Sequence, residues 1–264
     1  MRSGLSADVA REQMVSSAYK QKTVRSKASK LHDRVADELG IAIVSGRYPP
    51  GTSLATEVEA SENMNVSRTA YREAMRVLLS KGLVTSRPRS GTRVNPRKDW
   101  VILDPAVLGW IFASRPDEAF VRSIFELRRI VEPAAAALAA QRRSSQQLSL
   151  LGHALEEMDR HGLDTPTGAN ADQAFHEYIL DAAGNEALKG LTDSITFAIR
   201  MTTIFSYRAE KRPPDPIPAH RALYAAIAEG DTDRAHARAA ELIDAAFADT
   251  MRSLASMHSA KKVD

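Results

Sequence analysis

The stretch Thr56–Val94, TEVEASENMNVSRTAYREAMRVLLSKGLVTSRPRSGTRV, decides the fold of the N-terminal part of the chain. Its first residues predict a short helix from about Glu57 to Asn63. Thr56 is a suitable N-cap because a hydroxyl at that position accepts a free amide hydrogen of the first turn. Asn65 lies in the break that follows, where its short side chain tolerates the left-handed backbone of a tight helix–helix turn. A second helix should therefore follow at once.

That second helix is expected from Ser67, as its N-cap, to about Lys81, with Gly82 at the C-terminal cap. Apolar side chains at helical spacing predict its buried stripe: Tyr71, Ala74, Met75, Leu78 and Leu79. The opposite face is polar and basic, with Arg68, Thr69, Arg72 and Arg76. Guanidinium groups one turn apart suit phosphates and guanine edges, because each presents a fork of N–H donors.

Two short β-prone runs come next, at Leu83–Ser86 and Thr92–Val94. The turn between them, Arg87–Gly91, is basic. These features predict a two-stranded hairpin with a positively charged tip. A charged surface helix followed by an ordinary hairpin would use the same residue types, but helix, turn, basic helix and basic hairpin in this order favour a DNA-binding head with a wing.

The segments NVSRTAYREAMRVLLSKGLV and RPRSGTRV resemble the winged helix-turn-helix of the GntR superfamily of bacterial transcription regulators. The resemblance implies double-stranded DNA as the partner. The expected DNA-binding residues are Ser67, Arg68, Thr69, Arg72, Arg89, Ser90 and Gly91. One position departs from the family pattern, which often has an arginine between two acidic residues of the first helix. This chain has Val58 there, so one phosphate contact is expected to be missing.

Length and composition bound the remaining possibilities. A chain of 264 residues with 44% hydrophobic and 26% charged residues suits one small and one larger domain. The absence of cysteine excludes disulfides and thiolate metal sites. The net charge is only +3 although the pI is about 9.1, so the distribution of charge matters more than its sum. With no run of membrane-spanning length and no signal-peptide core, we expect a cytoplasmic, nucleoid-associated protein without a membrane partner.

The order of segments predicts two domains with connecting pieces. We expect a basic tail at 1–29, the winged head at 30–97, a linker and docking segment at 98–116, an all-α domain at 117–256 and a tail at 257–264. Residues 1–29 fit either a disordered tail or a basic arm that adds phosphate attraction. The apolar run Trp100–Trp110 is expected to begin the second domain and to dock the linker.

From Asp117 onward the chain has helical periodicity nearly throughout, and no segment alternates as a strand would. We expect a bundle of six or seven helices, which makes the whole protein mainly α. The pieces ELRRIVEPAAAALAA, DQAFHEYILDAAGNEAL and AHRALYAAIAEGDTDRA resemble the FCD ligand-binding domain of the FadR subfamily. The opening DWVILDPAVLGW is similar to that of repressors responsive to sugar acids of the D-galactonate type. The resemblance implies a small acid as the effector.

Two arginines lie where the periodicity predicts core. Arg128 shares a stripe with Val121, Ile124 and Phe125, and a guanidinium is rarely buried without a partner. It can pair with an internal carboxylate or face a cavity that takes an anion, and the family resemblance favours the cavity. Arg200, near Phe197, is a second candidate for an acidic effector, because arginine binds carboxylates through two parallel hydrogen bonds.

Asp172 and His176 lie one helical turn apart, and His220 lies on the apolar face of a later helix. A carboxylate and an imidazole at this spacing, with one more ligand from a neighbouring helix, can hold one divalent metal such as zinc. The FCD resemblance implies a further histidine on the last helix. That position falls near Leu242, and His236 lies too early. Two alternatives stay open: a three-ligand metal completed by effector or water, or direct effector contact without a metal.

The sequence therefore predicts a homodimeric, effector-responsive transcription regulator that binds a palindromic operator and is not an enzyme. Repression relieved by the effector is the expected sign. One alternative is a constitutive architectural DNA-binding protein whose helical domain only dimerises. A metallohydrolase built on Asp172, His176 and His220 is a remote third, because no general base or nucleophile accompanies the trio.

Overall fold

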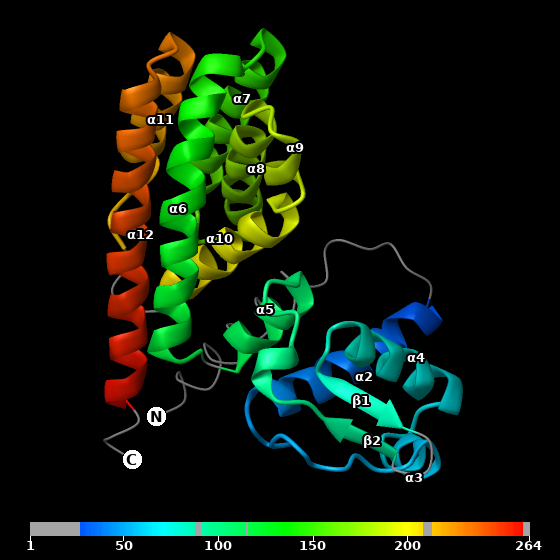
Figure 1. Ribbon diagram of the computed structural model, residues 1–264. Coiled ribbons are helices and arrows are strands. Elements are labelled where there is room, and N and C mark those ends of the chain that lie inside the picture. Colours follow the sequence, from blue (N-terminus) through cyan, green and yellow to red (C-terminus); the bar gives the residue numbers. More distant parts are fainter. Residues whose placement is uncertain (1–26, 88–90, 115, 208–212, 261–264) are drawn as a thin grey trace. The chain divides into compact units, whose positions relative to one another are not determined.

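The computed structural model describes residues 27–87, 91–114, 116–207 and 213–260, with side chains from Leu31 to Ser256 (Figure 1). The chain forms two compact units, one ending at Pro116 and the other beginning at Asp117. The first contains a helix-turn-helix with a small two-stranded sheet, and the second is a helical bundle. The predicted fold class is confirmed. No helix in the described ranges is long and apolar enough to cross a membrane.

The elements of the first unit follow the predicted order. They are α2 (Lys27–Val44), α3 (Glu57–Asn63), α4 (Arg68–Ser80), β1 (Val84–Arg87), β2 (Gly91–Val94), the 3₁₀ helix η1 (Arg97–Asp99) and α5 (Pro105–Ala113). Helix α4 packs on both α2 and α3. Val35, Leu39 and Ile43 of α2 supply the apolar surface beneath the helix-turn-helix.

Local capping chemistry sets the boundaries of α3 and α4. The Thr56 hydroxyl accepts the Glu59 amide hydrogen, and the Glu59 carboxylate accepts the Thr56 amide hydrogen, which makes a capping box. Ser67 caps α4 in the same way by accepting from the amide of Ala70. Asn65 has a φ of 49°, the left-handed conformation expected in the turn.

The predicted buried stripe of α4 needs one correction. Tyr71, Ala74, Met75 and Leu78 are buried, but Leu79 is 39% exposed. At about 100° per residue, Leu79 lies about 40° beyond Met75 around the helix axis. It is therefore past the edge of the face that packs on α2.

The wing is an antiparallel pair in which Val84 faces Val94 and Arg87 faces Gly91. Ser53 forms an isolated bridge with Arg93, so the segment before α3 is tied to the wing. Val84 and Val94 are buried, whereas Ser86 and Arg87 are exposed. Arg89 and Ser90, two of the expected DNA contacts, lie outside the described residues.

The sequence predicts that the run Trp100–Trp110 begins the second domain. In the structure this run belongs instead to the compact unit of the head. Helix α5 packs on α2, where the Trp110 indole donates from Nε1 to Asp37 Oδ1 at 2.9 Å. The Trp110 ring lies directly against Gly40. The apolar side chains of this run thus complete the core of the head, a contact between segments far apart in sequence.

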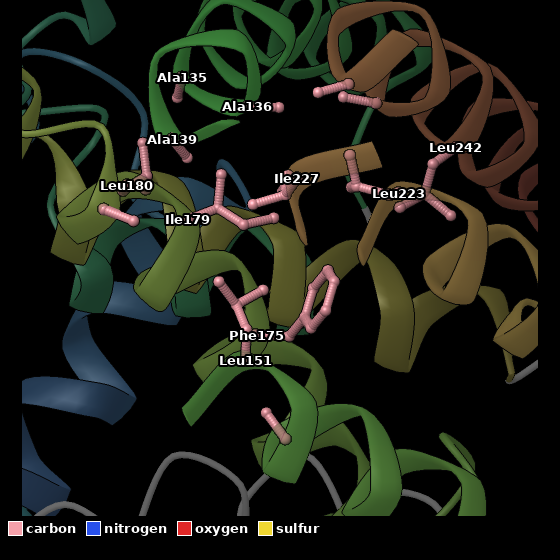
Figure 2. Close-up of a cluster of buried hydrophobic side chains, with 14 of the residues drawn as sticks. Ala135, Ala136, Ala139, Leu151, Phe175, Ile179, Leu180, Leu223, Ile227 and Leu242 are labelled. Carbon is pink, nitrogen blue, oxygen red and sulfur yellow. The ribbon is translucent and has the colours of Figure 1, made fainter. Parts of the chain in front are cut away.

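The second unit consists of α6 (Glu118–Arg142), α7 (Ser145–His161), α8 (Pro166–Ala182), the short α9 (Glu186–Lys189), α10 (Thr192–Ser206), α11 (Ile217–Glu229) and α12 (Thr232–Ala260). The two longest helices, α6 and α12, run side by side (Figure 1), and α8 packs on α6, α7 and α10. Buried alanines of α6 allow this close packing. Around them lies the main apolar core, in which Phe175, Ile179, Leu223 and Ile227 meet (Figure 2).

The backbone conformation and close packing at Gly82 allow a testable prediction about the stability of the head. Its φ is +70°, and a Cβ there would lie 2.1 Å from the backbone oxygen of Asp99. Gly46 has a similar φ of +80° but nothing within 4 Å of such an atom. Gly82→Ala should therefore cost at least about 2 kcal/mol of unfolding free energy, and Gly46→Ala about 1 kcal/mol.

The chain has two tryptophans, Trp100 and Trp110, and both lie in the head. Denaturant unfolding followed by tryptophan fluorescence therefore reports on this unit. Equal losses in the two variants would show that the segment around Asp99 does not pack against the end of α4.

Candidate functional site

Four helices of the bundle bring ionisable side chains together in its interior. Each of these side chains is at most 5% exposed: Arg128 and Glu132 of α6, Asp172 and His176 of α8, Arg200 of α10 and His220 of α11. Two threonines of α10, Thr202 and Thr203, contact them. Side chains of this kind are buried only when they are paired or bind an ion.

The carboxylate of Asp172 is at the centre of the cluster, and its two oxygens have different partners. Oδ2 accepts a hydrogen bond from the Thr203 hydroxyl at 2.9 Å. Oδ1 lies 3.1 Å from Nε2 of His220 and 3.7 Å from Nε2 of His176. Thr203 thus holds one oxygen and leaves the other facing both imidazole rings.

The other nitrogen of each ring is held by a group that can only accept a hydrogen bond. Nδ1 of His220 lies 2.9 Å from the carbonyl oxygen of Pro216, the residue before α11. Nδ1 of His176 lies 3.2 Å from Oε2 of Glu132, a carboxylate. Each Nδ1 therefore carries the hydrogen. In the neutral ring the Nε2 atom is then a bare lone pair.

Two Nε2 lone pairs and a carboxylate oxygen thus converge in a buried space. All three are acceptors, so they repel one another unless something positive lies among them. A proton on an Nε2 would satisfy one contact, and a cation would satisfy all three. The ligand atoms of Asp172, His176 and His220 lie within 4.8 Å of one another, so this group could hold a metal ion. Histidine nitrogen and carboxylate oxygen are ligands that zinc and similar metals prefer.

Both buried carboxylates remain ionised despite their surroundings. Burial by itself would raise the pKa of Glu132, but the charge of Arg128 and the hydrogen bond from His176 outweigh it and lower the pKa to about 2. Burial would likewise raise the pKa of Asp172, but a hydrogen bond from His220 in its protonated form, the charges of both histidines in that form and the hydrogen bond from Thr203 lower it to about 2. The cluster therefore presents negative charge to whatever occupies its centre.

Arg128 takes the first of the two arrangements left open by the sequence, an internal ion pair. Its Nε donates to Glu132 Oε1 at 2.6 Å, and its Nη1 donates to the Thr202 hydroxyl at 2.8 Å. The guanidinium also lies 4.8 Å from the centre of the Phe125 ring. Arg200 contacts Asn170, and burial lowers its pKa. Asn170 is two residues before Asp172, so Arg200 contacts the same stretch of α8 that carries this carboxylate.

A small cavity adjoins the cluster on the side of α12. Glu132, His176, Leu223 and Leu242 are among its lining residues, and Arg128 is not. Its volume is about 10 Å³, close to the space that one water molecule requires. Leu242 points toward Leu223 there (Figure 2) and so lies beside His176, near where a fourth ligand was expected. His236 is exposed and does not reach this interior.

The basic face of α4 is exposed as predicted, but two of its arginines already have partners. Arg68 and Thr69 are exposed at the start of the helix. Arg72 donates from Nη2 and Nε to the two carboxylate oxygens of Glu57, at 2.8 and 3.3 Å. Arg76 pairs with Glu73 on the same helix. Val58, at the position of the missing arginine, is 41% exposed.

Sequence reasoning missed Glu132, Thr202, Thr203 and the partner of Arg72. Glu132 had a usable signal, because it lies one helical turn after Arg128 and a buried guanidinium needs a carboxylate. The threonines gave none, since threonine at a core position is common. The Glu57–Arg72 pair joins two helices and depends on their packing, which no local pattern specifies.

Comparison with known proteins agrees with this architecture. Residues 31–94 match the model of the gntR family of bacterial regulatory proteins, and residues 123–245 match the FCD domain. The galactonate operon transcriptional repressor of Escherichia coli K12 is 34% identical over 212 residues, which are 80% of this chain and 93% of that repressor. The transcriptional regulator LutR of Bacillus subtilis 168 is 29% identical over 200 residues, 74% of this chain and 90% of LutR.

A solved structure shows the same fold. It is that of Lar, described as controlling the expression of the Listeria monocytogenes agr system, with a TM-score of 0.60 and 20% sequence identity. The match covers 88% of this chain and 99% of Lar. At this identity the likeness concerns the fold alone.

The lowered pKa of Asp172 makes a testable prediction about acid stability. A depressed folded-state pKa means that the stabilisation is present above the unfolded value of 3.8 and is lost as the pH falls toward about 2. The difference in unfolding free energy between the wild type and Asp172→Asn should therefore shrink by up to about 2 kcal/mol between pH 5 and pH 2.5.

This difference would be measured by urea unfolding with chelator present, followed by circular dichroism. Asp244→Asn is the matched control, because its carboxylate is 62% exposed. A gap between wild type and Asp172→Asn that stays constant over this pH range would contradict the prediction.

Proposed function

We propose that this chain, which belongs to the gntR family of bacterial regulatory proteins and carries an FCD domain, represses its target genes until a small carboxylate or sugar acid binds the helical domain. Family membership makes it a DNA-binding transcription regulator with a ligand-binding domain, and not an enzyme. Repression and the class of effector are the proposed parts. The observation that carries them is the 34% identity to a galactonate operon repressor along nearly its whole length.

The head binds one half of a palindromic operator, and a homodimer binds both halves. Two identical heads related by a two-fold axis require two half-sites of opposite direction. In a helix-turn-helix, the N-terminal part of the recognition helix contacts the bases of the major groove. The corresponding part of α4 carries four of the expected DNA-binding residues: Ser67, Arg68, Thr69 and Arg72. The wing residues Arg89, Ser90 and Gly91 contact the backbone or the minor groove. Because it binds chromosomal DNA, the protein is associated with the nucleoid in this proposal.

Arg72 tests the DNA-binding surface. Its guanidinium is exposed, and the ion pair with Glu57 holds it in one orientation on the exposed face of α4. Arg72→Ala should weaken binding to operator DNA and reduce the slope of log affinity against log salt by about one, as expected for one lost phosphate contact.

The operator can be selected from a random duplex library, and binding measured by fluorescence anisotropy at several salt concentrations. Arg122→Ala is the matched control, because it removes an exposed, paired arginine from the helical domain. Unchanged affinity and slope in Arg72→Ala would remove Arg72 from the interface.

The effector is bound where Arg128 and Arg200 approach the carboxylate and imidazole cluster. Both guanidiniums are buried and carry the positive charge that an acid requires. The adjoining cavity of about 10 Å³ is far smaller than an ordinary ligand pocket. An acid of sugar size therefore binds only if the surrounding side chains move apart. That requirement provides a route from binding to a change in operator affinity.

One divalent metal per chain, zinc or a similar ion, completes the proposed site. Asp172 Oδ1 and the Nε2 atoms of His176 and His220 would hold it, and the hydrogen-bonded Nδ1 atoms keep both rings in the tautomer that this requires. A bound metal would offer a carboxylate or hydroxyl group of the effector a positive ligation site. Leu242 contributes no ligand atom, so the metal would have a position left for effector or water.

A thermal-shift series tests the effector proposal. D-galactonate and related sugar acids should raise the melting temperature of the wild type, because a ligand stabilises the fold that it binds. Arg128→Lys keeps the charge beside Glu132 but loses the planar fork, so the acid should bind about 10- to 100-fold more weakly. Chelator should also reduce the shift.

Arg129→Lys is the matched control, since Arg129 is the next residue but pairs with Asp244 at the surface. A normal shift in Arg128→Lys would refute its role in binding the effector. If no acid shifts the wild type while operator binding is retained, the alternative of a constitutive architectural protein is favoured.

A further inference from the structure

We propose that Glu132 is a positioning residue that fixes His176 in the tautomer whose Nε2 atom can bind a metal. It does so by accepting the Nδ1 hydrogen of His176 while its other oxygen is held by Arg128. This inference rests on the metal site proposed above, because positioning of Nε2 matters only if a cation binds there.

The two oxygens of Glu132 serve two different partners. Oε2 lies 3.2 Å from Nδ1 of His176, and Oε1 lies 2.6 Å from Nε of Arg128. The side chain is 5% exposed, so bulk solvent does not supply alternative partners. Arg128 is itself held by Thr202, which gives Glu132 a fixed orientation. The carboxylate is therefore a rigid acceptor aimed at one nitrogen of the ring.

The two histidines of the site are oriented by different means. Nδ1 of His220 faces a backbone carbonyl, that of Pro216, which no substitution removes. Nδ1 of His176 faces a side chain, so its orientation depends on the residue at position 132. His176 is thus the ligand whose tautomer can be altered by mutation, and His220 is an internal reference within the same site.

Glutamine at position 132 has the shape of glutamate but cannot serve both partners as an acceptor. Its single oxygen faces either Arg128 or His176, and the charged guanidinium is the stronger donor. The amide NH₂ then faces Nδ1 of His176 and donates to it. The neutral ring must move its hydrogen to Nε2, which removes the lone pair that would bind the metal.

The experiment compares full-length wild type, Glu132→Gln and Glu126→Gln. Glu126 lies on the same helix α6 but is exposed, so its substitution makes the same chemical change away from the site. Zinc affinity is measured by competition with a chelator of known affinity. Long-range proton–nitrogen NMR spectra of the metal-free, ¹⁵N-histidine-labelled proteins report which nitrogen of each neutral ring carries the hydrogen. A His176→Gln variant assigns the His176 signals.

We expect Glu132→Gln to bind zinc about 10- to 100-fold more weakly than wild type, because it loses the hydrogen-bond acceptor that orients a metal-binding histidine. Its His176 should change from the Nδ1–H to the Nε2–H form, while His220 stays in the Nδ1–H form. Glu126→Gln should match the wild type in both measurements. A purely structural role for Glu132 would not move the hydrogen on one ring alone.

Three outcomes overturn the inference. The first is an Nε2–H form of His176 in the wild type, which needs no variant and so holds even if Glu132→Gln fails to fold. The second is wild-type zinc affinity in Glu132→Gln. The third is weaker zinc binding with an unchanged tautomer, which would assign the effect to charge alone. A wild type that binds no zinc refutes the metal proposal itself, and the NMR measurement still decides whether Glu132 sets the tautomer.

Discussion

One constraint governs the interior of the helical domain. Three acceptor atoms, one oxygen of Asp172 and the Nε2 atoms of His176 and His220, face one another there and repel one another. Nε2 of His220 lies 3.1 Å and Nε2 of His176 lies 3.7 Å from the Asp172 oxygen, and all three side chains are buried. A folded chain holds such an arrangement only when a proton or a cation offsets the repulsion. The site is therefore built to contain a positive charge.

That constraint explains why the surrounding polar groups are placed as they are. Thr203 takes the second oxygen of Asp172, Pro216 takes Nδ1 of His220, and Glu132 takes Nδ1 of His176. Each contact fixes the orientation of one side chain, so that the two Nε2 atoms and the Asp172 oxygen stay directed toward one another. Because these groups come from α6, α8, α10 and the residue before α11, the same contacts also join four helices of the bundle. Local site chemistry and the packing of the domain are one network.

The sequence specified the head better than the site, for a physical reason. Caps, the left-handed Asn65 and the apolar stripe of α4 are local features, so α3 and α4 were predicted almost residue by residue. The Asp172 and His176 pair was visible at helical spacing, and His220 followed from its apolar face. What could not be predicted depends on packing between distant segments. The docking of Trp110 on α2 and the hydrogen bond from Arg128 to Thr202 of α10 are of this kind.

Leu242 connects the chemistry of the site with its capacity to respond. A fourth protein ligand would complete a tetrahedral metal and leave nothing for an effector to bind, whereas a leucine leaves one position open. The same leucine and Leu223, which lie close together in Figure 2, also line the cavity beside His176, and the volume of this cavity is about that of one water molecule. An acid that entered this cavity would have to displace the apolar contact between α11 and α12. Its binding would then be coupled to the packing of α12 on α6, the two longest helices of the domain.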